Sequence, residues 1–240
     1  MPSIGKTLKK SFADSYDYLG LVLFCSFLWF GIVIAILSTA KLPLTTLVHV
    51  LLFIVLCILL LSPITAGVLT VARKIAARDD PSILDLFLGF KHFLIPAWKL
   101  GTSEIVITVL LVGNIWFYLT LTMPLKLVSV FFFYLLLAWI MSMIYHYPLL
   151  IEQNPGTLKI LKRGFLLMLD NLGFTTVIFL AIIMLTCLCI VTLVGLPLLY
   201  AGMVGIFATR AARALFIKYG ILPPEPEPQP VTDDVWRLPD

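Results

Sequence analysis

The sequence predicts an all-α, polytopic membrane protein with six transmembrane helices, and three observations lead to this prediction. First, 61% of the 240 residues are hydrophobic and 12% are charged, whereas soluble domains carry about 25% charged residues. Second, six apolar stretches are each long enough to cross a bilayer. Third, two of the connections between these stretches carry the same short amphipathic phrase, which indicates an internal pseudo-repeat.

Each predicted span contains about 20 mostly apolar residues, the length needed to cross a hydrocarbon layer of about 30 Å. The first span is full length and five more follow it, so we interpret it as a retained helix and not as a cleaved signal peptide. The expected spans are Tyr18–Thr39, Leu44–Ala72, Gly101–Leu121, Leu127–Ile151, Leu172–Val194 and Leu196–Ile217. Residues 1–220 then form one transmembrane domain, and residues 221–240 form a Pro/Glu-rich, disordered cytoplasmic tail.

Basic residues indicate the orientation in the membrane. Of the 17 Lys and Arg residues, all but Lys41 and Lys126 fall on one side of the predicted spans. Such residues mark the cytoplasmic side, so both termini are predicted to be cytoplasmic. The net charge of +4 is explained by this bias, and no nucleic-acid partner is expected. The basic residues singled out at the membrane surface are Arg73, Lys74, Lys162 and Arg163.

The repeated phrase reads DDPSILDLFLGF between spans two and three, and QNPGTLKILKRGF between spans four and five. In each copy an acidic or amide residue before a proline, Asp80 or Asn154, predicts a helix start. Apolar residues then recur at helical spacing, which predicts a cytoplasmic amphipathic helix in the membrane interface or against the spans. Gly89 and Gly164 are expected where another helix approaches closely.

Several short segments resemble a known family. They are Phe27-Leu28-Trp29-Phe30, Pro63-Ile64-Thr65-Ala66-Gly67 before Arg73-Lys74, Phe87-Leu88-Gly89-Phe90, Tyr147-Pro148-Leu149-Leu150 and the helix from Leu158 to Asn171. Through them, residues 16–220 resemble the YesL-like family of small bacterial integral membrane proteins of unknown function. The chain departs from the family pattern at Ser26, where an asparagine is expected. The resemblance implies a six-helix protein of the bacterial cytoplasmic membrane that is associated with carbohydrate uptake, and it supplies no catalytic residues.

Ionisable residues within the spans are the first candidates for a functional site, because burying them in lipid is costly. Glu104, early in span three, and His146, late in span four, are expected at similar depth. Together they would form a proton-sensitive polar site. In the alternative interpretation, Glu104 contacts Lys99, Arg73 or interfacial water, and His146 reaches the lipid headgroups.

Two further residues within the spans are candidates. Asn114, near the outer end of span three, is expected to hydrogen-bond across helices and hold them together. Pro63 is expected to kink span two and to free a carbonyl group, with Ser62 and Thr65 close enough to compensate.

Motifs for catalysis and metal binding are missing from the sequence. There is no zinc-protease motif, phosphate-binding loop or glycine-flanked nucleophilic serine, so no enzymatic activity is expected. The four cysteines and three histidines lack the spacing of metal ligands, so no metal or other cofactor is expected either.

The hypotheses that follow belong to different classes of protein. The first is a non-enzymatic accessory or scaffold subunit, with the lipid bilayer and a transporter permease as its partners. The alternative is an autonomous transporter or channel for a small solute or lipid, with Pro63 and the Glu104–His146 region along its path. A third interpretation is an enzyme acting on lipid-linked substrates, for which the sequence offers no catalytic constellation.

Overall fold

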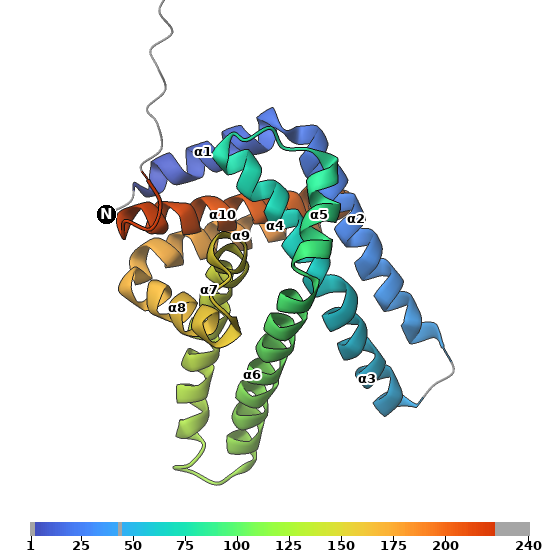
Figure 1. The fold of residues 1–240 in the computed structure, drawn as a ribbon. Coiled ribbons are helices and arrows are strands. Elements are labelled where there is room, and N and C mark those ends of the chain that lie inside the picture. Colours follow the sequence, from blue (N-terminus) through green and yellow to red (C-terminus); the bar gives the residue numbers. More distant parts are fainter. Residues whose placement is uncertain (1–2, 43–44, 224–240) are drawn as a thin grey trace, which may run out of the picture.

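The computed structural model describes residues 3–42 and 45–223, so the predicted tail lies outside the described residues from position 224 onward. Within these ranges the chain forms helices and no strands, which confirms the all-α prediction (Figure 1). The described residues also include the six predicted spans. They are Leu19–Lys41, Thr46–Ala77, Leu94–Thr120, Leu127–Gln153, Leu172–Thr192 and Leu196–Lys218.

Some spans consist of more than one helix. Span one is α2 (Leu19–Ser38) with the short 3₁₀ turn η1 (Thr39–Lys41), and span two is α3 (Thr46–Leu56), the π-helix η2 (Cys57–Leu61) and α4 (Ser62–Ala77). Spans three, four and five are α6 (Leu94–Thr120), α7 (Leu127–Gln153) and α9 (Leu172–Thr192). Span six is the π-helix η3 (Leu196–Tyr200) followed by α10 (Ala201–Lys218).

Three short helices precede spans one, three and five. They are α1 (Ile4–Asp17), α5 (Ile83–His92) and α8 (Thr157–Asp170). The predicted amphipathic helices are α5 and α8, whereas α1 is a third one that the sequence pattern did not predict. One residue with non-helical backbone separates each short helix from its span: Tyr18, Phe93 and Asn171, with φ of −111°, −96° and −129°. The described chain is therefore built from three similar units, each a short helix, a one-residue break and two spans, which extends the predicted pseudo-repeat.

The short helices connect these units in cyclic order. Helix α5 packs against α4, α8 packs against α7, and α1 packs against α10. Each short helix thus covers the second span of the preceding unit, and α1 completes the cycle by covering the last span of the chain. Figure 1 shows α1 lying along α10 although the two are at opposite ends of the sequence. The second spans α4, α7 and α10 also contact one another and form the centre of the structure.

Helix α1 buries a polar face against its neighbours. The buried residues are Thr7, Ser11, Asp14 and Ser15. The three hydroxyl groups donate to carbonyls one turn earlier in the chain, with Ser11 Oγ to Thr7 O at 2.9 Å and Ser15 Oγ to Ser11 O at 2.7 Å. Because these groups are already satisfied, the face behaves as a row of small side chains that permits close helix packing.

Ion pairs join two of the short helices, α1 and α5, to central spans. The Asp14 carboxylate of α1 accepts from Arg210 Nε of α10 at 2.5 Å, and both side chains are at most 8% exposed. The Asp85 carboxylate of α5 lies 2.8 Å from Lys74 Nζ of α4. Because these carboxylates are buried, each needs its cationic partner to offset the loss of hydration.

Small residues on α10 allow close approach of α2. A Cβ atom at Gly202 would lie 2.7 Å from the Val22 carbonyl oxygen, so no larger residue fits there without movement. The Gly202 N–H donates to Ser26 Oγ at 2.9 Å, and Ser26 is fully buried. The position at which the chain departs from the YesL-like pattern therefore has a polar role, which a hydroxyl group fulfils.

The predicted helix starts at Asp80 and Asn154 are wrong. Helix α5 begins after Ser82, whose backbone N–H donates to the Asp85 carboxylate at 2.8 Å in a capping box. Helix α8 begins after Gly156. Asp80 and Asn154 instead have positive φ values of 36° and 41°, and they turn the chain where the preceding span has ended. Asp and Asn tolerate this conformation better than most residues, which explains the same residue types in a different role.

The Asp14–Arg210 ion pair gives a prediction about stability. Replacing Asp14 by Asn leaves Arg210 buried without that carboxylate, which we expect to cost about 3–5 kcal/mol. The measurement is the thermal unfolding temperature of the purified protein in detergent. The control is Asp17→Asn, because Asp17 lies on the same helix and is exposed. Equal losses in the two variants would contradict the assigned role of the ion pair.

Candidate functional site

The structure brings Glu104 of α6 and His146 of α7 together. Glu104 Oε1 lies 2.8 Å from His146 Nδ1, the histidine side chain is fully buried, and the glutamate side chain is 12% exposed. Glu104 is about 15 Å along α6 from its first residue, so the pair lies well inside the span. Of the two interpretations of the sequence, the geometry is that of the pair and not of separate contacts with interfacial groups.

The second nitrogen of His146 also has a polar neighbour. His146 Nε2 lies 3.4 Å from Ser142 Oγ, and Ser142 itself donates to the Trp139 carbonyl at 2.7 Å. With its proton used in this way, Ser142 can only accept a hydrogen bond from Nε2–H, while the Glu104 carboxylate accepts from Nδ1–H. A ring protonated on both nitrogens fills both contacts at once, and a neutral ring fills one of them.

Neighbouring residues fix the position of the imidazole ring. A Cβ atom at Gly164 of α8 would lie 2.5 Å from His146 Cδ2, so the glycine lets α8 approach the ring closely. On another side, the Trp139 ring centroid is 5.2 Å from that of His146. Trp139 Nε1 donates to Thr108 Oγ1 at 3.1 Å, which links α7 to α6 a second time. The expected close approach is confirmed at Gly164, and also at Gly89, which faces Thr70 of α4.

The order of groups Ser142, His146, Glu104 is that of a nucleophilic triad, but the surroundings differ. The side chains of Ser142 and His146 are fully buried. A substrate therefore has no path to the serine hydroxyl in this conformation, and that hydroxyl is already bonded within its own helix. The arrangement holds and orients a carboxylate, and it does not present a nucleophile.

A cavity of about 350 Å³ lies beside Glu104, and we call it the Glu104 cavity. Its walls come from α3, η2, α4, α6 and α7, and they are mainly apolar. The polar groups on the wall are the Glu104 carboxylate and the side chains of Ser62, Thr65 and Tyr147. The residues that line the cavity are Phe53, Ile54, Cys57, Leu61, Ser62, Thr65, Gly101, Glu104, Ile105 and Tyr147.

The expected irregularity at Pro63 forms one wall of this cavity. Pro63 has no N–H to donate to the Leu59 carbonyl, and the π-helix η2 precedes it directly. The Leu59 carbonyl accepts instead from Trp98 Nε1 of α6, at 3.1 Å. The hydroxyls of Ser62 and Thr65 donate to other carbonyls, those of Cys57 and Leu61. The freed carbonyl is therefore satisfied from a neighbouring span, and the expected compensation by Ser62 and Thr65 is wrong.

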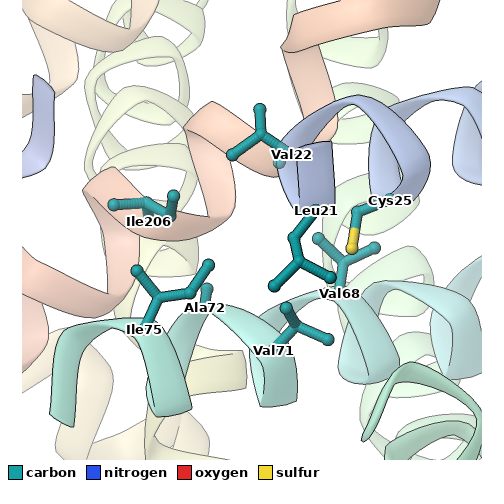
Figure 2. A pocket seen from close by; sticks show the side chains of 9 residues that line it. Leu21, Val22, Cys25, Val68, Val71, Ala72, Ile75 and Ile206 are labelled. Carbon is teal, nitrogen blue, oxygen red and sulfur yellow. The ribbon is translucent and has the colours of Figure 1, made fainter. Parts of the chain in front are cut away.

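Among the other hollows of the described structure, two lie between α2, α4 and α10. One, of about 310 Å³, lies between α2, α4, α7, α9 and α10, and it shares Thr65 and Tyr147 with the Glu104 cavity. The other is the small void of Figure 2, where Leu21 and Cys25 of α2 face Val68 and Ile75 of α4 and Ile206 of α10. Its volume is about 10 Å³ and its lining side chains are apolar, so it is a packing defect without polar partners for a water.

The other predicted site residues lie apart from the pair. Asn114 Nδ2 donates to the Leu110 carbonyl of its own helix at 2.7 Å in an exposed position, so the expected bond across helices is wrong. Among the predicted surface residues, Lys162 is exposed, and Arg163 Nη1 donates to Gln153 Oε1 at 2.6 Å. Arg73 lies 3.9 Å from the Glu152 carboxylate of α7.

Sequence reasoning missed several members of the site. Ser142 lies one turn before His146, and this i, i+4 spacing was the available signal. No pattern pointed to Thr108 and Trp139, because their hydrogen bond depends on how α6 packs against α7. Glu152 of α7 was missed as well. Its carboxylate lies near Arg73 of α4 and accepts from Arg213 Nη1 of α10 at 3.0 Å, so it links the three central spans.

The fold and the buried polar pair define a helical, multi-pass membrane protein. Comparison of the chain with models of protein families, with curated proteins and with solved structures found no match. The resemblance to the YesL-like family therefore stays a prediction from the sequence.

The contact between Gly164 and His146 gives a second prediction. Replacing Gly164 by Ala displaces the ring, and we expect a loss of about 1–3 kcal/mol from overpacking. Gly173→Ala is the matched control, because a Cβ atom there meets nothing within 4 Å. Thermal unfolding of both variants in detergent is the measurement. If Gly164→Ala is as stable as the control, α8 does not hold the ring in the way described.

Proposed function

We propose that the chain is a non-enzymatic accessory or scaffold subunit of a membrane complex, and that its partner is a permease of a carbohydrate transport system. The observation that carries the accessory role is the incomplete packing of the spans. In the most apolar window of α6, 11% of the residues are buried within the chain, against 61% in the sixth span. The partner class comes from the resemblance to the YesL-like family alone.

The hairpin of α6 and α7 carries a group of exposed aromatic side chains. Large apolar side chains there are more than half exposed, and they include Trp116 at 73%, Phe117 at 58%, Phe131 at 63% and Tyr134 at 64%. Figure 1 shows this hairpin extending away from the centre of the structure, as α3 also does. Aromatic side chains are enriched in protein interfaces, so the hairpin supports contact with another membrane protein as well as with lipid.

An autonomous carrier for a small solute or lipid is the second candidate. It is favoured by the position of Glu104 on the wall of a cavity beside the Pro63 break, because such breaks line binding sites in transporters. Against it, the walls of this cavity and of the neighbouring one are mainly apolar. A path for a polar solute needs more polar groups than these walls offer.

We further propose that the chain lies in the bacterial cytoplasmic membrane with both termini in the cytoplasm. The bias of basic residues supports this. Lys41 ends the first span of its unit, and Lys126 lies directly before the second span of its unit. Cysteines placed at Leu125 and at Asp79, in a variant without native cysteines, would test it in intact cells. An impermeant maleimide should label the first and not the second, and the reverse pattern would overturn the orientation.

The accessory role predicts a stable complex. After mild solubilisation of the native membrane, quantitative mass spectrometry of the tagged protein should find a transporter permease near a one-to-one ratio. A photo-reactive residue at Phe117 or Tyr134 should crosslink to that permease, whereas one at Leu158, an exposed apolar position on α8, should not. An unrelated six-span protein is the control for nonspecific recovery. Isolation of the chain without a stoichiometric partner would count against the accessory role.

A further inference from the structure

We propose that the Glu104 cavity binds a monovalent lipophilic cation, with the Glu104 carboxylate as its counter-ion. This proposal does not rest on the accessory function, because the residues that line the cavity are not those of the proposed partner surface. The ligand combines one positive charge with an apolar body that matches the cavity walls.

The charge of the ligand follows from Glu104. It is the one charged residue among those that line the cavity. Its Oε1 atom contacts His146, whereas no hydrogen bond engages Oε2 within the described residues. Glu104 lines a mainly apolar cavity and its side chain is 12% exposed, so the carboxylate has lost much of its hydration, and a cation restores a favourable interaction with it.

The hydroxyl groups on the wall favour the same sign of charge. Ser62 Oγ donates its proton to the Cys57 carbonyl at 3.5 Å, and Thr65 Oγ1 donates to the Leu61 carbonyl at 2.7 Å. These two protons are therefore not available to a ligand. Thr65 Oγ1 already accepts from Trp29 Nε1 at 3.0 Å, and the Tyr147 side chain hydrogen-bonds Ser62. An anion needs donors, and a sugar needs donors and acceptors in number, so neither fits this wall as well as a cation does.

The rest of the wall suits an apolar ligand body. Phe53, Ile54, Leu61 and Ile105 contribute aliphatic and aromatic surface to a cavity of about 350 Å³. Phe53 is 44% exposed, so the cavity is accessible beside α3. In Figure 1, α3 and α6 spread apart as they run away from α4 and α5. A lipophilic cation, which concentrates in the membrane, can enter from that side.

Equilibrium dialysis of the purified full-length protein in detergent tests the proposal. The probes are radiolabelled phenyltrimethylammonium and the larger tetraphenylphosphonium. At least one of them should bind saturably, at about one per chain. Glu104→Gln should weaken this binding by at least about tenfold. The uncharged isostere tert-butylbenzene makes no use of the charge. It should therefore bind equally well to the unchanged protein and to Glu104→Gln, as measured by its competition with the probe.

Two cysteine variants give an independent test of the location. Cys57→Phe fills the cavity and should abolish binding, whereas Cys187→Phe places the same side chain on an exposed face of α9 and should leave binding unchanged. Thermal unfolding shows whether each variant is folded. If Glu104→Gln is not folded, the comparison of the two cysteine variants decides. Absence of saturable binding of both probes, binding unaffected by folded Glu104→Gln, or equal effects of the two cysteine variants would each overturn the proposal.

Discussion

The contact between α1 and α10 completes the cyclic arrangement of the structure, and the buried Asp14–Arg210 ion pair lies within it. Without this contact the other short helices would still cover α4 and α7, but the last span would lack its cover. Arg210 would then lose the Asp14 carboxylate, and removal of one partner from a buried ion pair is strongly unfavourable. The ion pair therefore links the two ends of the chain, and it makes the position of α10 depend on a helix that precedes the first span.

The proline break connects the architecture to the candidate site. Lipid offers no hydrogen bonds, so a carbonyl freed within a span must be satisfied by the protein. Trp98 satisfies the Leu59 carbonyl and so fixes α6 against the break. This contact places Glu104, further along α6, on the wall of a cavity formed in part by the same break. His146 then orients the carboxylate from α7, and the exposed aromatic side chains of the hairpin lie elsewhere on the same two helices.

The spans, α5 and α8 could be predicted because lipid selects long apolar segments and because amphipathic helices have a periodic apolar face. Helix α1 could not be predicted in this way, since its buried face carries Thr7, Ser11 and Asp14 in place of an apolar stripe. The pairing of Glu104 with His146 was predictable as one of two interpretations from depth alone. The contacts with other helices depend on packing angles, which one sequence does not encode in any local pattern.

Hydrogen–deuterium exchange of the full-length protein in lipid nanodiscs tests the central claim most directly, namely that three short helices cover three central spans in cyclic order. The account predicts that backbone amides of α1 are protected to a degree similar to those of α5 and α8, because each helix packs against a span. Exchange of α1 at the rate of an unfolded segment, with α5 and α8 protected, would contradict it. The cycle would then be open, and the proposed role of the Asp14–Arg210 ion pair would be wrong.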